Sequence, residues 1–301
     1  MFIIKHKKIF LSISVILVLL SIASIFIFGL QIGIDFKGGA LTEVVYTNYR
    51  PVQADLDAQF KTLDIGSILI QPTGELGYII KSVDLTEIQH SLLLKTLSQD
   101  GKNPLEEKDF NSIGPSVGRE LTRKAIIAIV LVSIGIILFI AFAFRKVSKP
   151  VSSWKYGLMA IVSLLHDVII PIGLFTILSH FYGAEVDTLF VVAALTILGL
   201  SVSDTIVIFD RIRENLRNKI ETNFNDTVGR SLDQSYMRSI FTSLTVIIVL
   251  LSLFFFGPES IKYFALMLTA GMFFGTYSSI FLASPLLVLI EELQTNKQAK
   301  K

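Results

Sequence analysis

Residues 188–209 read TLFVVAALTILGLSVSDTIVIF, and Asp204 is the only charged side chain in this stretch. A helix needs about 20 predominantly apolar residues to cross the hydrocarbon core of a membrane. The stretch therefore predicts a membrane-spanning helix. Five more stretches of comparable length and apolar character predict the other spans of a six-span protein, and they cover residues 9–34, 125–144, 156–181, 239–258 and 263–290.

The composition agrees with this fold class. Hydrophobic residues make up 52% of the 301 residues, charged residues make up 17%, and the mean hydropathy is +0.65. Soluble domains carry roughly 25% charged residues, so the chain lacks the polar surface of a soluble enzyme, a disordered segment or a nucleic-acid-binding protein. The sequence contains no cysteine, which excludes disulfides, thiolate metal sites and thiol nucleophiles.

The sequence also lacks the common motifs of catalysis. It has no G-x-x-x-x-G-K-[ST] loop for ATP and no H-E-x-x-H zinc motif. The string GIDFKGG at residues 33–39 lacks the Lys-Ser/Thr ending of a phosphate loop, so a tight turn or hinge is the better interpretation. We therefore expect no enzyme activity, no cofactor and no bound metal.

The charges divide the chain into parts that face different surroundings. Residues 30–122 carry 13 acidic and 8 basic side chains, whereas the rest of the chain has an excess of basic ones. We expect a water-exposed segment between the first and second spans. The predicted organisation is an N-terminus with the first span, an external domain, a five-helix membrane domain and a tail, at residues 1–30, 31–122, 123–291 and 292–301.

The external segment has the pattern of a small α+β domain. Alternation of apolar residues predicts strands, and apolar residues at helical spacing predict helices. The resulting order is strand, helix, strand, strand, helix, strand, which is the order of a ferredoxin-like fold. The predicted elements are residues 40–47, 52–63, 67–71, 78–81, 86–97 and 109–113.

Basic residues in short loops mark the cytoplasmic side of a membrane protein. They precede the first span, lie between spans two and three and between four and five, and end the chain: Lys5, Lys7, Lys8, Arg145, Lys146, Lys149, Lys155, Arg211, Arg213, Arg217, Lys219, Arg230, Lys297, Lys300 and Lys301. We expect both ends of the chain inside the cell and the external domain outside, although Arg123 and Lys124 lie on the other side.

The first span has a second interpretation as a cleaved signal peptide. Its apolar core is longer than the usual stretch of roughly 7–15 residues, and no small-x-small cleavage site precedes Gln31. We therefore expect an uncleaved helix.

Two polar residues of the fourth and fifth spans are expected to meet. Asp204 lies about five residues before the cytoplasmic end of its span, and Arg238 opens the fifth span from the same side. Arg238, Thr242, Thr245 and Ser252 form one polar stripe, because they follow each other at steps of four, three and seven. Two interpretations stay open: a static ion pair that stabilises packing, or a carboxylate that gains and loses a proton.

Three other groups of residues are candidates for a role. His166 and Asp167, near the centre of the third span, form a second intramembrane polar site. Gly271 and Gly275 form a small-xxx-small motif of the kind that packs membrane helices together. The junctions of the external domain contain Gly38, Gly39, Gly114 and Pro115, which we predict to be hinges because glycine tolerates unusual backbone angles.

Four strings resemble the SecF family of membrane subunits of the bacterial protein-export machinery. They are GIDFKGG at 33–39, IGPSVGREL at 113–121, SVSDTIVIFDRIREN at 201–215 and RSIFTS at 238–243. The resemblance covers nearly the whole chain. One departure concerns Ser203, since the family usually has Asn before the membrane Asp; a shorter hydroxyl can still hydrogen-bond Asp204.

The resemblance implies a function in protein export at the cytoplasmic membrane. SecF works with SecD, a related six-span protein, beside the SecYEG channel, and both resemble transporters of the resistance–nodulation–division superfamily. The proton-motive force is thought to move the external domains and so to promote late steps in the export of unfolded preproteins. The residues matching the family's proton pathway are Asp204 and Arg238, with Ser203 and Thr242 beside them.

Two alternatives remain at this point. The first is a proton-driven half-transporter that exports a small hydrophobic molecule, and a large apolar cleft in the external domain would favour it. The second is a purely structural assembly subunit in which Asp204 is always paired. The coupling ion is also open, because Na⁺ can replace H⁺.

Overall fold

The computed structural model describes residues 2–60, 63, 65–66, 68–143 and 151–299. The basic residues Arg145, Lys146, Lys149, Lys300 and Lys301, used above to predict orientation, lie outside the described residues. The chain forms two compact units. One contains residues 1–31 and 128–301, here called the helical unit, and the other contains residues 32–127, here called the α+β unit.

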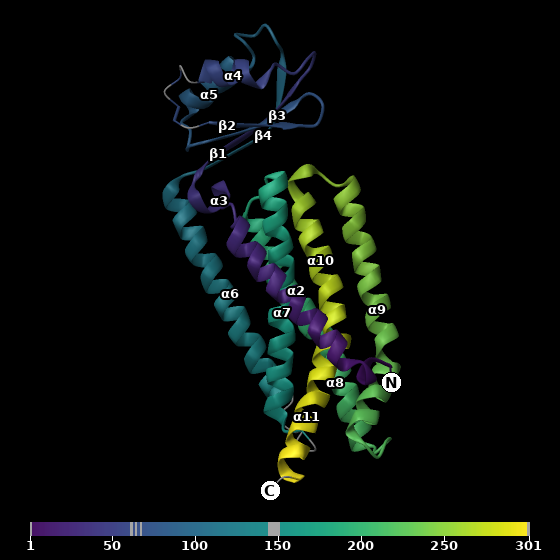
Figure 1. Ribbon diagram of the computed structural model, residues 1–301. Helices are drawn as coiled ribbons and strands as arrows, with labels where there is room; N and C mark the ends of the chain where they lie inside the picture. Colours follow the sequence, from purple (N-terminus) through teal and green to yellow (C-terminus); the bar gives the residue numbers. More distant parts are fainter. Residues whose placement is uncertain (1, 61–62, 64, 67, 144–150, 300–301) are drawn as a thin grey trace. The chain divides into compact units, whose positions relative to one another are not determined.

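The described residues contain six helical segments that are long and apolar enough to cross a membrane. This number confirms the prediction of six spans. The sixth consists of α10, a π-helical segment η2 and α11, which run on from one another (Figure 1). The segments are α2 (Lys7–Phe28), α6 (Pro115–Ala143), α7 (Ser153–Tyr182), α8 (Thr188–Arg217), α9 (Phe224–Phe256), α10 (Lys262–Ser278), η2 (Ser279–Ala283) and α11 (Ser284–Ala299).

Helices α8 and α9 extend beyond the predicted spans into a polar hairpin. Their ends are held by Asn215, whose amide donates to Ser231 Oγ at 2.8 Å and to Gln234 Oε1 at 2.9 Å. Phe224 and Val228 are buried against α8 in the same region. Hydropathy marks only the part of a helix that suits hydrocarbon, so the predicted spans end before these extensions, although the basic run at residues 211–219 is expected to be a solvated helix.

The α+β unit confirms the predicted order of strands and helices. Its four strands form one antiparallel sheet in the order β2-β3-β1-β4, which is the ferredoxin-like arrangement. The elements are β1 (Gly39–Tyr46), α4 (Gln53–Phe60), β2 (Leu69–Thr73), β3 (Gly77–Ser82), α5 (Glu87–Leu97) and β4 (Leu105–Ile113).

Alternation along β1 places the core on one face of this sheet. Ala40, Thr42, Val44 and Tyr46 are buried, while the residues between them are half-exposed. Helices α4 and α5 cover the buried face with the side chains of Leu56, Phe60, Leu93 and Leu97. The hydroxyl of Tyr46 donates to the carbonyl of Leu97 at 3.0 Å. Burial raises the pKa of the Tyr46 phenol.

Two local details explain where the elements begin. Helix α5 begins at Glu87, after the N-cap residue Thr86. The Thr86 hydroxyl accepts from the amide of Gln89, while the Gln89 side chain accepts from the amide of Thr86. Strand β4 begins at Leu105 rather than at the predicted 109. The prediction was wrong there because β4 is an exposed edge strand rich in charged residues, and a β-bulge opposite Glu43 shifts its register.

The residues predicted to be hinges lie together inside the α+β unit. A Cβ atom on Gly38 would lie 2.9 Å from Pro115 Cα, and one on Gly39 would lie 2.6 Å from the carbonyl oxygen of Ser82. Both glycines have positive φ, at 80° and 142°. Gly114 has more space, since its nearest neighbour would be 3.4 Å away. The junction is closely packed, and its role as a hinge stays a prediction.

Small residues bring the membrane helices close together. A Cβ atom on Gly271 of α10 would lie 2.3 Å from Ile197 Cγ1 of α8, and one on Gly275 would touch Ser201 at 3.4 Å. Helix α2 packs on α7 through Gly173, where an added Cβ would lie 2.4 Å from Ser21 Cβ. Ser24 donates to the Gly173 carbonyl at 3.0 Å. In contrast, nearly all described side chains of α6 are exposed or half-exposed.

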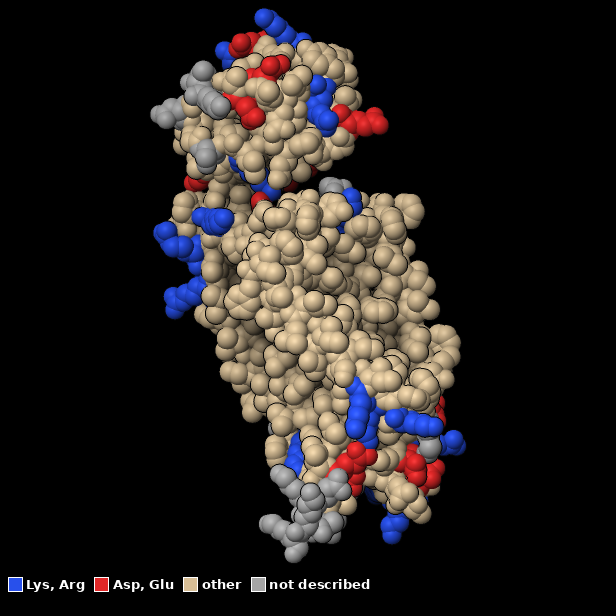
Figure 2. All heavy atoms as spheres, viewed as in Figure 1, with Lys and Arg blue, Asp and Glu red and all other residues tan. Residues whose placement is uncertain are grey.

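The surface of the helical unit suits a bilayer. On the face shown in Figure 2, a wide band of the helical unit carries neither blue nor red atoms, and the charged side chains of this unit gather mainly at the end where α8 and α9 meet. Large hydrophobic side chains such as Leu19, Leu20 and Phe26 of α2 are more than half exposed. Lipid tails can cover such a band without cost, whereas water cannot.

Candidate functional site

Asp204 lies on α8 among hydroxyl groups of two other helices. Ser243 Oγ of α9 donates to its Oδ2 at 3.3 Å, and Thr276 Oγ1 of α10 donates to the same oxygen at 3.4 Å. The two hydroxyl oxygens lie 2.5 Å apart, and because each hydroxyl has one hydrogen, one donates to the other and one donates to Asp204 at a time. The carboxyl group is half-buried. One carboxylate inside the bundle is therefore held by long, weak hydrogen bonds from neutral groups.

The expected contact between Asp204 and Arg238 is not formed in this structure. Arg238 is exposed, and among the described residues no hydrogen bond or ion pair joins it to Asp204. Ser203 is exposed as well and does not bond Asp204 within the described chain. Arg238 and Ser203 therefore lie on the outer surface of the helical unit, near the site but not in contact with the carboxylate.

The predicted polar stripe of α9 also faces outward. Thr242 and Thr245 are exposed, and their hydroxyls donate to carbonyls four residues earlier on the same helix, at 2.9 and 2.8 Å. The inner face carries Ser239 and Ser243, which are both buried. Helical spacing shows that residues share a face but not which face points inward. Ser243 takes the position beside Asp204 that we expected for Thr242.

His166 and Asp167 form a fully buried cluster with three serines. His166 Nδ1 lies 2.8 Å from Asp167 Oδ1. Ser278 of α10 donates to Oδ2 at 2.6 Å, and Ser201 of α8 donates to the same oxygen. Ser163 of α7 in turn donates to Ser278 at 2.9 Å. One carboxylate of α7 thus connects α8 and α10.

The two carboxylates use neighbouring positions of the same helices. On α8, Ser201 binds Asp167 and precedes Asp204 by three residues, which is nearly one turn. On α10, Thr276 binds Asp204 and Ser278 binds Asp167. The segment η2 follows directly after Ser278. Short π-helical segments are rare and are frequent at functional sites, so the sixth span is irregular where it meets both acids.

Sequence reasoning missed three of the hydroxyl groups that hold the acids. Ser243, Thr276 and Ser278 are uncharged and break no apolar run, so hydropathy does not mark them. The density of Ser and Thr in residues 276–284 was a signal that could have found them, because hydroxyl groups inside a membrane need partners. Within the described residues, no group of three or more His, Asp or Glu side chains lies close enough to hold a metal ion.

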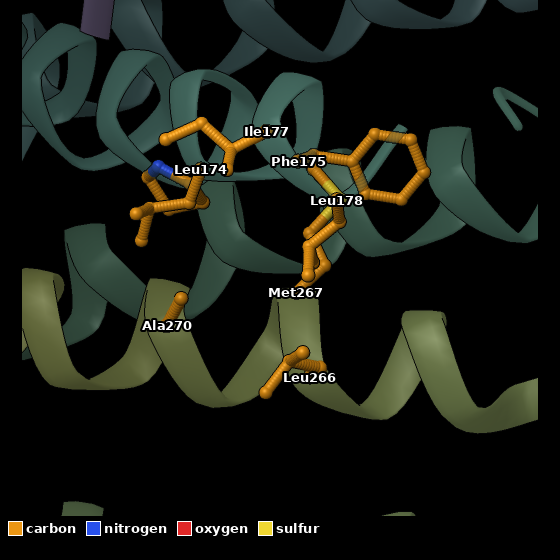
Figure 3. A pocket seen from close by; sticks show the side chains of 8 residues that line it. Leu174, Phe175, Ile177, Leu178, Leu266, Met267 and Ala270 are labelled. Carbon is orange, nitrogen blue, oxygen red and sulfur yellow. The ribbon is translucent and has the colours of Figure 1, made fainter. Parts of the chain in front are cut away.

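An apolar cleft of about 270 Å³ lies between α7 and α10 (Figure 3). Its lining is hydrocarbon and consists of Pro171, Leu174, Phe175, Ile177, Leu178, Leu266, Met267 and Ala270. This cleft belongs to the helical unit. The observation that would favour the exporter of small hydrophobic molecules considered above is a large apolar cleft in the external domain.

Comparisons with known proteins bear on this arrangement. Residues 93–293 match the sequence model of the family described as protein export membrane protein SecD/SecF, C-terminal. Among curated relatives, protein translocase subunit SecF of Thermobaculum terrenum is 41% identical over 298 residues, which cover 95% of this chain and 92% of the relative. The protein of the same name from Anaerolinea thermophila is 34% identical, with 96% and 94% covered.

Solved structures agree in fold. The crystal structure of SecDF, a translocon-associated membrane protein from Thermus thermophilus, matches with a TM-score of 0.80 at 30% identity. The match covers 96% of this chain but 38% of that one, so this chain spans well under half the length of the solved protein. A second SecDF crystal structure, in a super-membrane-facing form, matches with a TM-score of 0.69 at 29% identity. The chain therefore belongs to the SecF family of protein translocase subunits.

Proposed function

We propose that the chain acts in Sec-dependent protein export together with SecD, beside the SecYEG channel in the cytoplasmic membrane. The proton-motive force drives it and promotes late steps in the passage of unfolded preproteins. The observation that carries this proposal is Asp204: a carboxylate inside a membrane helix bundle, held by hydroxyls of α9 and α10 and by no cation within the described residues.

The energetics favour a proton as the coupling ion. A charge costs on the order of 3 kcal/mol at the bilayer centre on insertion scales, and less toward the end of a span, where Asp204 lies. The two hydroxyl contacts of Asp204 are at 3.3 and 3.4 Å, too long to compensate such a cost fully. Protonation neutralises the group instead. Each elementary charge that crosses 100 mV releases about 2.3 kcal/mol, which is enough to shift the balance between two helix arrangements.

The outward-facing polar residues support SecD as the partner. Ser203, Arg238, Thr242 and Thr245 are exposed on α8 and α9, within segments that otherwise suit lipid. A guanidinium at such a position needs an acid or water. A second membrane protein across this face would supply both a cover and an acidic partner for Arg238. This chain matches 38% of the solved SecDF chain, and the remaining length of that chain is sufficient for a second membrane protein of this kind.

The working cycle then has two states. When Asp204 is ionised, Arg238 turns toward it; when Asp204 is protonated, the arginine pairs with an acid of SecD. The helices pack differently in the two states, and this difference moves the external domain. We place both termini in the cytoplasm and the external domain outside. Basic residues such as Lys7, Arg217 and Arg230 lie in short segments on the side of the membrane opposite the external domain, and such residues mark the cytoplasmic side.

The test is export of a secretory precursor into inverted membrane vesicles with and without a proton gradient, at equal protein abundance. Asp204→Asn should lose the gradient-dependent part of export, because it resembles the protonated acid permanently. Asp204→Glu should keep part of it, and Arg238→Lys should be poor because a point charge replaces a planar fork. Asp210→Asn is the matched control, since Asp210 is exposed on the same helix and pairs with Arg213.

A sodium gradient applied with a protonophore separates the two candidate ions. Export that follows the sodium gradient alone would replace H⁺ by Na⁺ in the proposal. Normal gradient-driven export by both Asp204→Asn and Arg238→Met would show that Asp204 has a structural role only.

A further inference from the structure

His166 has a buried nitrogen that the packing of the bundle leaves without a hydrogen bond. The side chain is 3% exposed, and its Nδ1 lies 2.8 Å from Asp167 Oδ1. The opposite nitrogen, Nε2, is buried and has no hydrogen-bond partner among the described residues. Buried polar atoms nearly always have a partner, so an orphan nitrogen at the centre of a membrane helix calls for an explanation.

The contacts of Asp167 determine which nitrogen of the ring carries the hydrogen. Oδ2 accepts from Ser201 and Ser278, and Oδ1 faces Nδ1. An ionised Asp167 only accepts hydrogen bonds, so in this state its contact with the ring places the hydrogen on Nδ1. In the neutral imidazole the lone pair then lies on Nε2. This nitrogen is therefore the free proton acceptor of the cluster.

The groups packed around the His166 ring are mostly uncharged, so Asp167 is the counter-charge of a protonated ring. On α10, the ring of Tyr277 stacks on His166 with centroids 6.0 Å apart, and Phe274 meets it edge-on at 6.5 Å. On α8, the acidic group is Asp204, three residues beyond Ser201. On helix α2, Ser14 donates to the Tyr277 hydroxyl at 3.5 Å, and the Phe10 carbonyl accepts from that hydroxyl at 3.3 Å. Within the described chain no lysine or arginine forms an ion pair with His166 or Asp167.

We propose that His166 and Asp167 form a second proton-binding site, separate from Asp204, in which His166 Nε2 takes up the proton. A hydronium ion gives its proton to the Nε2 lone pair and leaves as water. The imidazolium so formed is neutralised by the carboxylate of Asp167 at 2.8 Å. The loaded pair therefore carries no net charge, which lowers its cost inside the bilayer.

The serines connect this site to Asp204. Ser201 on α8 and Ser278 on α10 lie on or beside the turns that carry Asp204 and Thr276. Loading His166 changes the charge distribution that Asp167 presents to both serines. A shift of α8 against α10 would then alter the hydroxyl groups that reach Asp204. This coupling rests on the proposed proton-driven function, whereas proton binding at His166 does not.

His166→Asn isolates the titrating nitrogen. Its side-chain amide can still donate to Asp167 from nearly the position of Nδ1, but it offers no second nitrogen that accepts a proton. Thr205→Val is the matched control. The Thr205 hydroxyl is buried, bonds Ser279 at 3.0 Å between α8 and η2, and contacts neither acid.

The direct test is nitrogen NMR of the full chain in lipid nanodiscs with ¹⁵N-labelled histidine. The sequence has four histidines, and the His166 signals are those missing from His166→Asn. Over a series of samples of decreasing pH, we expect the Nε2 signal to change from the neutral to the protonated form, and Asp167→Asn to abolish this change. A signal that stays neutral over the whole range, or a titration unaffected by Asp167→Asn, overturns the proposal.

Vesicle export tests the coupling separately. His166→Asn should lose most of the gradient-dependent export and keep the gradient-independent part, while Thr205→Val keeps both. Normal gradient-driven export by His166→Asn overturns the coupling. If Asp204→Asn and Arg238→Met both keep normal gradient-driven export while the His166 signal still changes with pH, Asp204 has a structural role only and the second proton site stands.

Discussion

Gly173→Ala tests how closely the first membrane helix packs on the bundle. The added Cβ would lie 2.4 Å from Ser21 Cβ and 2.6 Å from Ser21 Cα. Carbon atoms in ordinary contact are about 3.5–4.0 Å apart. Because Ser21 Cα belongs to the backbone, no rotamer change relieves the overlap, and α2 must move away from α7 by about 1 Å or more.

The expected cost follows from the structure. Overpacking of a close contact costs about 1–3 kcal/mol. Movement of α2 also weakens the bond from Ser24 to the Gly173 carbonyl, at 3.0 Å, and such a bond is worth about 0.6 kcal/mol in a membrane. Alanine returns up to about 1 kcal/mol through its helix propensity. We expect a net loss of about 1–2 kcal/mol in the free energy of unfolding.

The measurement is unfolding in mixed micelles by SDS titration, followed by circular dichroism. Gly135→Ala on α6 is the matched control, because an added Cβ there meets nothing within 4 Å. The control should be unchanged or slightly stabilised. If Gly173→Ala unfolds at the same SDS fraction as Gly135→Ala, α2 does not pack on α7 as closely as the structure indicates.

Two further predictions concern the α+β unit and the topology. Tyr46→Phe should destabilise this unit by about 1 kcal/mol at neutral pH, because the hydrogen bond to the Leu97 carbonyl is lost. Hydrogen exchange of the α5 amides measures this loss, and Tyr49→Phe is the control because Tyr49 is exposed. Burial raises the Tyr46 pKa above that of the unfolded chain, so this unit should also lose stability as pH rises above about 10, and less so in Tyr46→Phe. For topology, Ser98→Cys should react with an impermeant thiol reagent added outside intact cells, and Asn218→Cys should not. The cysteine-free parent protein is the blank, and the opposite labelling pattern would reverse the proposed orientation.

Periodicity and charge along the chain were sufficient for the architecture. Stretches without charge predicted six spans because hydrocarbon excludes charged side chains, wherever the helix lies in the bundle. Thr86 predicted the start of α5 because a capping box needs only residues close in sequence. The charged edge strand β4 was the exception, since its register depends on a bulge opposite Glu43 rather than on its own pattern.

The sequence by itself therefore determined the spans, the α+β unit and the two intramembrane acids, Asp204 and Asp167, because each depends on local composition and on the cost of charge in a membrane. Only the tertiary structure decided what these acids contact. Spacing places residues on one face of a helix, but packing between helices decides which face points inward, and so Ser243 rather than Thr242 lies beside Asp204. Likewise, Ser201 and Ser278 meet at Asp167 only because α7, α8 and α10 cross there.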